Sequence, residues 1–399
     1  MAIFINPTFW IVAVAVYLAL SINVKIRPTL RFGVVNLLAL GALLGWLPAL
    51  GAMAIITLFW GLLRAFSSLS PTEGRTRTLC GFSIIGLLTF FFILHKLNLE
   101  NSGFLGQLNE SAPWARPDLL LPFLATLSFS YVFVRCLDAI HCVCWKKQAL
   151  MDPISLTGYL IPFHMLLSGP VNSYEEHQAM DADPQPETPT EDSVLLILNA
   201  ITTGLFYKFV IAEGMRIYYF GMDGAFTVSS WSDASFLVVY VFFDFAGYSR
   251  IARGLGLLYN VPTPENFSAP FLSPTVTEFW TRWHMSMGQF VRRNLFTPMQ
   301  LNLVRWAGVK RAGAVSVFTL ILSFGFVGLW HRLSPAWFLW GAGMGILMAI
   351  EKQIQSLAFR RGWNRSPGLS LALQCIGPIY VFFALAVSAY FVGEEVFTS

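Results

Sequence analysis

Uncharged apolar runs alternate with short basic clusters along the first part of the chain. A helix that spans a bilayer needs about 20 apolar residues, and five crossings are expected at residues 7–24, in the two halves of 32–63, and at 78–94 and 119–134. The run 32–63 is too long for one crossing. Gly45-Trp-Leu-Pro48 near its middle predicts the turn of a helical hairpin, because proline breaks the hydrogen-bond ladder of a helix.

The basic clusters predict which side of the membrane each loop faces. Clusters at 25–31, 64–77 and 135–147 each follow an odd-numbered crossing. Because positively charged loops stay in the cytoplasm, these clusters are expected inside and the N-terminus outside. The first run has no basic segment before it and no clear cleavage site after it, so it is interpreted as a retained helix rather than a signal peptide.

The second half is less regular and begins with a broken segment at 154–170, which Pro162 interrupts. A basic region at 282–311 is expected in the cytoplasm, as is the loop 135–147, so three full crossings cannot lie between them. We therefore expect 154–170 to be a re-entrant element beside a cavity, since irregular backbone at membrane depth is tolerated only inside protein or next to water. Further helical runs are expected at 194–207, 236–243, 312–330, 336–350 and 369–393, with 352–365 in the cytoplasm.

Composition supports an all-α polytopic membrane protein. Hydrophobic residues make up 55% of the 399 residues and charged residues 12%, whereas a soluble domain carries about 25% charged residues. We expect one transmembrane domain over 1–399, with N-terminal helices in 1–150, a motif-bearing core in 154–350 and a C-terminal helix in 351–399. The net charge of +4 is small and scattered, which argues against nucleic acid as a partner. The five cysteines are irregularly spaced and predict no disulfide framework. His141-Cys-Val-Cys144 could hold a metal or an acyl group, but small apolar cysteines at a helix end are the favoured interpretation and no metal site is expected.

His331 is the first candidate for chemistry. It ends the uncharged run 312–330 and is followed by Arg332. An ionisable group at membrane depth is costly and is usually kept for function, and imidazole can take up and return a proton near neutral pH. The alternative is a histidine at the membrane interface that packs on Trp330.

Two further stretches place polar groups beside apolar runs. Asp244 directly follows the run 236–243. Trp280, Trp283 and His284 are spaced i, i+3 and i+4, so they would share one face of a helix. The alternative for this second stretch is an amphipathic helix in the interface, with its aromatic side chains at headgroup level.

Taken together, five stretches resemble the signature of one family. In chain order they are Ser168-Gly-Pro-Val-Asn-Ser-Tyr174, Phe243-Asp-Phe-Ala-Gly-Tyr-Ser249, Pro264-Glu-Asn-Phe267, Phe279-Trp-Thr-Arg-Trp-His-Met-Ser286 and Gly328-Leu-Trp-His331. The chain is similar to the membrane-bound O-acyltransferases (MBOAT), in particular to the bacterial branch that includes alginate O-acetylation proteins and the protein that transfers D-alanine to teichoic acids. Two positions depart from the pattern. Arg332 stands where the family commonly has glycine, and the usual basic residue of the Gly-Pro element is replaced near Asn172-Ser173.

The resemblance implies a helical bundle with re-entrant elements around a central cavity, in the cell (inner) membrane. It also implies an acyltransferase that moves an acetyl or D-alanyl group from a cytoplasmic thioester to a hydroxyl of an extracytoplasmic polysaccharide, teichoic acid or similar acceptor. The donor would be acyl coenzyme A or an acyl carrier protein, which acts as co-substrate, and no bound cofactor is expected. Other expected partners are the bilayer and the extracytoplasmic acyltransferase or assembly proteins that handle the polymer.

The resemblance further implies roles for individual residues. His331 matches the family's characteristic histidine and is expected to be the general base, while His284 would orient a substrate or stabilise the oxyanion. Asp244 and Glu278 are candidates to orient His331. Substrate-binding or supporting roles are expected for Asp244, Asn266, Trp280, Arg282, Trp283 and Trp330, and Arg292 and Arg293 are expected to form the rim of a cytoplasmic opening for the donor.

Two other classes of function fit the residues taken alone. Broken apolar runs and buried charges also suit a transporter, although no obvious repeat relates the two halves. A membrane scaffold without catalytic activity, which serves a cell-envelope assembly, is the third class. An acyl-enzyme route is disfavoured because no cysteine or serine stands in a recognisable nucleophile motif.

Overall fold

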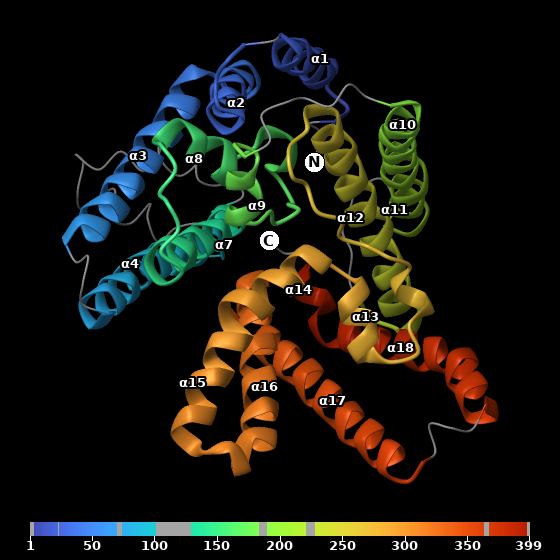
Figure 1. The fold of residues 1–399 in the computed structure, drawn as a ribbon. Helices are drawn as coiled ribbons and strands as arrows, with labels where there is room; N and C mark the ends of the chain where they lie inside the picture. The colour runs from blue at the N-terminus through green and yellow to red at the C-terminus, as the bar shows by residue number, and fades with distance from the viewer. Residues whose placement is uncertain are drawn as a thin grey trace, which may run out of the picture. The chain divides into compact units, whose positions relative to one another are not determined.

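A computed structural model of the protein describes residues 4–22, 24–69, 74–100, 129–182, 190–220, 228–362 and 367–396. Within these ranges the regular secondary structure is helical, and the one β pairing is an isolated antiparallel bridge between Phe267 and Trp283. The all-α fold class expected from the sequence is confirmed (Figure 1).

The helices of the first part of the chain are α1 (Pro7–Ser21), α2 (Pro28–Leu44), α3 (Trp46–Leu69), α4 (Gly74–Glu100), α7 (Phe129–Ile140), η2 (His141–Trp145), α8 (Pro153–Leu160), η3 (Phe163–Met165), α9 (Tyr174–Ala179), α10 (Glu191–Leu205), η4 (Phe206–Ala212) and α11 (Glu213–Phe220). They are followed by α12 (Trp231–Tyr259), η5 (Pro270–Leu272), α13 (Val276–Arg282), α14 (Met285–Val291), η6 (Arg292–Phe296), α15 (Thr297–Ala307), η7 (Val309–Arg311), α16 (Ala312–His331), α17 (Pro335–Arg360) and α18 (Pro367–Val396).

Several helices of the described residues are long and apolar enough to cross a membrane. They cover Trp46–Ser67, Glu191–Tyr219, Trp231–Tyr259, Val309–His331 and Leu373–Gly393, and shorter apolar helices cover Pro7–Ser21, Pro28–Leu44 and Gly81–Leu97. The expected runs 194–207 and 236–243 were too short, because polar residues interrupt the apolar pattern there without ending the helix. Residues 119–128 of the expected crossing 119–134 lie outside the described residues.

The expected hairpin turn within 32–63 is confirmed, but glycine rather than proline makes it. α2 ends at Leu44 and α3 begins at Trp46. Gly45 between them has φ 93°, a left-handed conformation that glycine adopts without strain. Pro48 lies in the first turn of α3, where backbone N–H groups have no intrahelical partner and none is lost.

The described residues form two compact units. The N-terminal unit comprises Met1–Thr203 and Ser249–Pro264, and the C-terminal unit comprises Gly204–Tyr248 and Glu265–Ser399. The broken segment 154–170 therefore packs with the N-terminal helices. The motif-bearing helices α13, α14 and α16 belong with α17 and α18.

The segment 154–170 is anchored on α2. Its helix α8 is about 12 Å long at 1.5 Å per residue, too short to cross a bilayer. The two backbones touch, because a Cβ atom built on Gly33 of α2 would lie 2.2 Å from the carbonyl oxygen of Ile154. Where α8 ends, the buried Asn36 side chain donates to the Ile161 carbonyl (3.2 Å) and accepts from the Phe163 N–H (2.8 Å). The polar groups freed by the break are thus satisfied inside the protein, as a re-entrant element requires.

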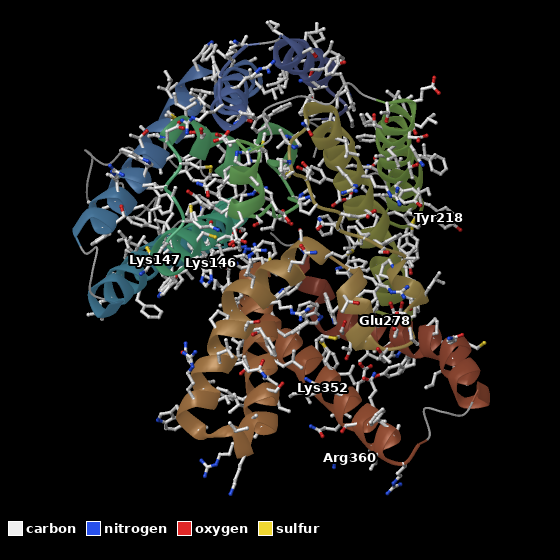
Figure 2. All side chains as sticks on the ribbon, in the orientation of Figure 1. Lys146, Lys147, Tyr218, Glu278, Lys352 and Arg360 are labelled. Carbon is white, nitrogen blue, oxygen red and sulfur yellow. The ribbon has the colours of Figure 1, made fainter. Side chains whose placement is uncertain are left out.

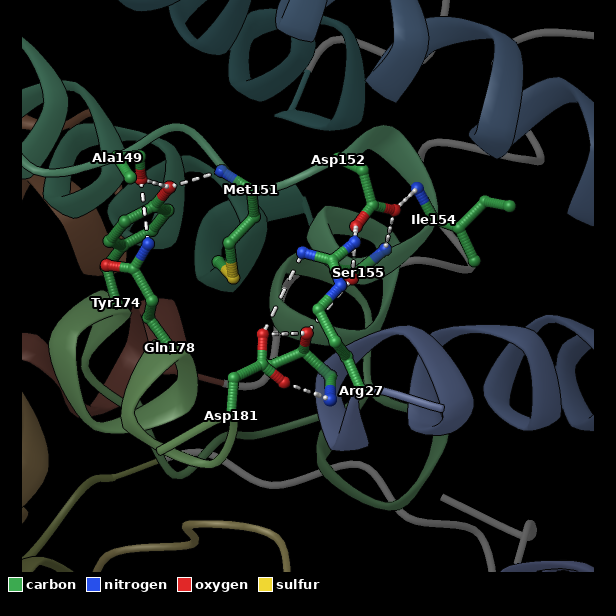
Figure 3. Close-up of polar contacts among 10 residues, drawn as sticks. Arg27, Ala149, Met151, Asp152, Ile154, Ser155, Tyr174, Gln178 and Asp181 are labelled. Carbon is green, nitrogen blue, oxygen red and sulfur yellow. Dashed lines mark hydrogen bonds and ion pairs between the residues drawn. The ribbon is translucent and has the colours of Figure 1, made fainter. Parts of the chain in front are cut away.

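Charged groups fix the start of α8 to the start of α2 (Figure 3). Asp152 caps α8 by accepting from the backbone N–H groups of Ile154 (3.1 Å) and Ser155 (3.0 Å), and it also pairs with Arg27 (2.7 Å). Asp181 accepts from both the backbone N–H (3.0 Å) and the hydroxyl (2.8 Å) of Thr29. Two carboxylates therefore cap two neighbouring helix N-termini.

Arg135 of α7 holds the Gly-Pro element that follows η3. Its fully buried guanidinium donates to Asn172 Oδ1 (2.8 Å) and to the carbonyl oxygens of Leu160 (3.0 Å) and Pro170 (2.8 Å). The sequence has no basic residue at Asn172-Ser173, yet a cation contacts this element from another helix. Arg135, distant in sequence, thus places a positive charge against a motif that has no basic residue of its own at these positions.

Candidate active site

α16 and α17 form a tightly packed antiparallel hairpin with His331 at its connecting end (Figure 1). Glycines bring the two backbones into contact. A Cβ atom on Gly328 would lie 1.9 Å from the Trp337 carbonyl oxygen, and one on Gly341 would lie 2.1 Å from the Phe324 carbonyl oxygen. Because no side chain larger than hydrogen fits at these points, the position of His331 relative to α17 is fixed.

Three tryptophans surround the His331 imidazole. Its ring centroid lies 4.9 Å from that of Trp330, 5.4 Å from that of Trp337 and 6.0 Å from that of Trp340. Trp330 is buried, whereas His331 itself is exposed. The imidazole thus has aromatic walls and an open side.

His284 stands at a break between α13 and α14. The helical face expected for Trp280, Trp283 and His284 is wrong, because α13 ends at Arg282 and Trp283 is extended. His284 has φ 47°, a left-handed conformation that is uncommon outside glycine and that clusters at functional sites. Its ring meets the edge of Phe245 at 4.8 Å and lies 6.3 Å from Trp330.

Asn266 explains why the helix breaks there. Its carbonyl oxygen accepts from the Met285 N–H (3.0 Å), and its side-chain oxygen accepts from the Ser286 hydroxyl (2.6 Å) and N–H (3.3 Å). The neighbouring Phe267 pairs with Trp283 in the isolated bridge. These bonds replace the intrahelical ones that a continuous helix would make.

Burial also sets the charge of His284. The side chain is 6% exposed and lies outside the membrane-spanning helices. Burial lowers the pKa of His284 to about 3, and the nearby His331 acts on it in the same direction. His284 is therefore neutral at physiological pH and can donate one N–H or accept one proton.

Both histidines line one cavity of the C-terminal unit. The cavity has a volume of about 740 Å³, within the range of small-molecule sites. Its walls come from α12, α13, α14, η6, α16, α17 and α18 and are mostly apolar and aromatic. The chemically distinctive lining residues are His284, His331, Trp280, Trp337, Arg292 and Lys352.

A family comparison agrees with this geometry. Residues 146–391 match the model of the MBOAT, membrane-bound O-acyltransferase family. The chain belongs to that family. The resemblance drawn from the five motifs is therefore confirmed, and with its long apolar helices this MBOAT member is a multi-pass membrane protein.

Three curated relatives indicate the range of similarity within the MBOAT family. A teichoic acid D-alanyltransferase of Bacillus subtilis is 26% identical over 262 residues, which cover 65% of this chain and 64% of that protein. A probable alginate O-acetylase of Pseudomonas syringae is 28% identical over 70% of this chain and 53% of that protein. A peptidoglycan O-acetyltransferase of Helicobacter pylori is 30% identical over 48% of this chain and 36% of that protein. The matches span less than two thirds of each relative.

The cavity of this MBOAT member gathers part of the predicted set. His331, His284, Trp280, Trp283 and Arg292 line it. Two further predicted residues contact these positions or their neighbours: Trp330 packs beside both histidines, and Asn266 holds the chain break. Asp244, Arg282 and Arg293 are not among the lining residues.

The two carboxylates considered as orienters of His331 bond to cations. Asp244 accepts from Lys208 of η4 at 2.5 Å, an ion pair in which the lysine side chain is only 5% exposed. Glu278 pairs with Arg282 one helical turn later on α13. A buried ion pair such as Lys208–Asp244 fixes one helix against another, because separating the charges would leave both unpaired in an apolar medium.

Lys352 is a cavity residue that sequence reasoning missed. It projects from α17, as does Arg360 two turns later, while Glu278 projects from α13 (Figure 2). The sequence predicts that the helical run ends at Ile350, where the apolar residues stop, and places 352–365 in the cytoplasm. α17 instead continues to Arg360, so Lys352 lies on a helix that lines the cavity. A signal was present, since good helix-forming residues continue beyond Ile350.

Proposed function

We propose that this protein transfers an acetyl or D-alanyl group from a cytoplasmic thioester to a hydroxyl of an extracytoplasmic cell-envelope polymer. The observation that carries the proposal is the shared cavity, in which His331 and His284 face the same space as Arg292 and Lys352. Family membership supports acyl transfer, and the names of the relatives supply teichoic acid, alginate and peptidoglycan as examples of the acceptor class.

His331 is the general base in this proposal. It accepts the proton of the acceptor hydroxyl while the hydroxyl oxygen forms a bond to the thioester carbonyl carbon. The resulting tetrahedral oxyanion collapses, the carbon–sulfur bond breaks, and the leaving thiolate takes the proton back from His331. The exposed imidazole at the end of α16 is accessible to an acceptor on its open side, and three tryptophan rings border it on the others.

His284 stabilises the oxyanion. Burial keeps its imidazole neutral, so it presents an N–H without the cost of a buried positive charge. The Asn266 bonds and the Phe245 contact hold the ring in place. A donor that does not have to reorganise during the reaction gives the largest electrostatic benefit.

In this proposal the donor enters from the end of the cavity at which Lys352 lies. Lys352 follows Trp337 by about four turns of α17, or roughly 22 Å along the helix axis. A thioester carried on a pantetheine arm is long and mostly uncharged and has phosphate at its far end. Lys352 would attract that phosphate, while the arm reaches along the apolar walls toward His331, and Arg292 is a second cation that lines the cavity.

This arrangement implies a membrane orientation. A thioester made in the cytoplasm must meet the Lys352 end first, which puts Lys352 on the cytoplasmic side and the His331 end toward the outside. The positive-inside pattern gives the same orientation, with the N-terminus outside the cell membrane. The acceptor polymer, or a partner protein that carries it, then meets the His331 end.

The function can be tested with purified protein in liposomes. Acetyl-coenzyme A, an acetylated carrier protein and a D-alanylated carrier protein are offered in turn, with polymer fragments as acceptors, and thiol release and acylated acceptor are measured. Wild type should turn over one donor class, and His331→Ala should abolish turnover. The matched control is His141→Ala, which removes an imidazole in the N-terminal unit and should retain activity.

Two outcomes would contradict the proposal. Retention of more than about a tenth of wild-type turnover by His331→Ala would exclude it as the base, since loss of a general base costs about 10²–10⁴-fold. Absence of thiol release from every donor, in protein that binds or moves a polymer, would favour a transporter or a scaffold.

A further inference from the structure

Glu351 is a buried carboxylate of α17 that has no part in the proposed chemistry. It is 8% exposed, and its two oxygens accept hydrogen bonds from the backbone N–H groups of Val276 (2.7 Å) and Thr277 (2.8 Å), and from the Thr277 hydroxyl (2.6 Å). The Tyr380 hydroxyl of α18 donates to the same carboxylate at 3.1 Å. A buried charge with four donors is held in a defined geometry.

The Glu351 bonds cap the N-terminus of α13. The first N–H groups of a helix have no intrahelical partner, and those of Val276 and Thr277 are taken by Glu351. The next one, of Glu278, is taken by the Thr275 side chain at 3.1 Å. A negative charge at this end also interacts favourably with the helix dipole. The backbone N–H groups in the first turn of α13 are therefore hydrogen-bonded largely by a side chain of another helix, α17.

α13 depends on such anchors for its position. It has seven residues, Val276–Arg282, and a helix this short is not stable alone. Besides the Glu351 cap, it is held by Trp280, whose ring packs edge-on against Phe324 of α16 (5.5 Å) and Trp340 of α17 (5.9 Å). Both anchors come from the hairpin that carries His331.

The other end of α13 leads directly into His284. The Trp283 N–H still bonds to the Phe279 carbonyl (2.8 Å), so the helix transmits its position to the residue next in sequence. α13 and the hairpin therefore form one connection between His284 and His331, in addition to the Asn266 bonds that hold the chain break. The Glu351 cap is the polar part of that connection.

We propose that Glu351 is a positioning residue, which sets His284 against His331 by fixing the start of α13 to α17. The activity readout of this inference rests on the proposed function. A small displacement of a catalytic group can cost about 10²-fold in rate, so loosening α13 should lower kcat much more than it changes KM for the donor.

Three variants separate positioning from general support of the fold. Glu351→Gln keeps the shape of the side chain. Its amide NH₂ group, however, would face one of the two backbone N–H groups that donate to the carboxylate in wild type. Thr277→Val removes only the hydroxyl bond, which is the mildest loosening of α13. Tyr380→Phe is the matched control, because it removes a bond to the same carboxylate from α18 and none from α13.

Three measurements are made on each variant. Steady-state kinetics give kcat and donor KM, with thermal unfolding recorded alongside. Spin labels at Thr281 of α13 and Gln353 of α17, both exposed positions, report the distance between the two helices. Glu351→Gln should lower kcat by about 10- to 100-fold and broaden the distance distribution. Thr277→Val should lower kcat and broaden the distance distribution to a smaller extent. Tyr380→Phe should leave both kcat and the distance distribution near wild type.

The outcomes distinguish the inference from the proposed function. Unchanged kcat in both Glu351→Gln and Thr277→Val would overturn the positioning role while transfer by wild type stands. Equal losses in all three variants, in step with thermal stability, would make Glu351 a fold-stabilising residue only. If Glu351→Gln does not fold, an unchanged kcat in Thr277→Val overturns the role. If wild type turns over no thioester, the proposed function fails, and an unchanged label distance in Glu351→Gln or Thr277→Val still overturns the positioning role.

Discussion

His164 and His177 of the N-terminal unit can be compared with His284 and His331 of the C-terminal unit, because both pairs lie among aromatic rings. His164 and His177 have no exposed surface, and each ring lies 6.1 Å from that of Phe32. Burial lowers the pKa of His164 to about 3 and that of His177 to about 4, and the nearby Arg135 lowers both as well. His284 is shifted just as far, so a lowered pKa does not identify a catalytic histidine in this protein.

The difference between the pairs is what they face. His284 and His331 line a cavity, whereas His164 is packed in the interior with its Nε2 3.1 Å from the Thr263 hydroxyl. Perturbed pKa values occur in structural as well as catalytic clusters. Access to a space that can hold a substrate separates the two cases, and each prediction below tests that separation.

The largest expected effect separates a catalytic from a packing histidine. His331→Ala should lower kcat by about 10²–10⁴-fold with thermal stability near wild type, because the side chain is already exposed. His177→Ala should lower stability, because it leaves a void among Phe32 and Tyr159, while kcat per folded molecule is kept. Kinetics and thermal unfolding of both variants in one detergent are the measurement. Loss of stability in His331→Ala together with loss of kcat in His177→Ala would contradict the assignment of His331 as catalytic and His177 as a packing residue.

The next effect concerns the second cavity histidine. His284→Ala should lower kcat by about 10²-fold, the usual loss for one oxyanion donor, with donor KM little changed. His164→Ala is the matched control from the N-terminal unit, and its kcat should stay within a few-fold of wild type after correction for folded protein. A fall in protein yield alone for His284→Ala would instead support the interfacial-packing alternative.

A smaller effect is expected at two cations that line the cavity, Lys352 and Arg292. Lys352→Gln and Arg292→Gln should each raise donor KM by about three- to tenfold, the loss of roughly 1 kcal/mol of charge attraction. The difference from wild type should shrink as salt screens the attraction. Arg360→Gln, on the same helix but not lining the cavity, and Arg293→Gln should leave KM unchanged. Equal effects of all four variants would point to lipid anchoring or topology.

The smallest effect is a pH dependence of stability in the N-terminal unit. Unfolded histidine binds a proton below about pH 6.5, while folded His177 stays neutral down to about pH 4. Between these values the unfolded state binds more protons, so stability falls as pH falls, by up to about 1.4 kcal/mol per pH unit for one such site. His177→Phe should weaken this slope. Thermal unfolding between pH 7 and pH 5 checks it, and equal slopes in both proteins would contradict it.

The sequence predicted what depends on neighbouring residues. The apolar run 312–330 predicted both α16 and the place of His331 at its end, and the length of 32–63 predicted a hairpin. Each depends on hydropathy over one or two dozen residues, which a linear pattern contains. The five motifs placed His284 and His331 in one family site, although no local rule puts them in one cavity.

What the sequence did not predict depends on distant partners. The break at His284 arises because Asn266, 20 residues before Ser286, takes the bonds that would continue the helix. Glu351 caps a helix that begins 75 residues before it. Arg135 reaches the Gly-Pro element from α7. In each case a polar side chain competes with a regular backbone pattern, and tertiary structure alone decides which bonds form.

The glycine contacts between α16 and α17 restrict how the cavity can change shape. Where Gly328 and Gly341 bring backbone against backbone, any sliding or parting of the two helices would open a gap that no side chain can fill. The α16–α17 hairpin therefore behaves as one rigid body. A change in the shape of the cavity must instead come from the walls contributed by α12, α13, α14, η6 and α18. Of these, the seven-residue α13 is anchored at its start by the Glu351 cap. In the proposed reaction the acyl group and the product would pass along these walls.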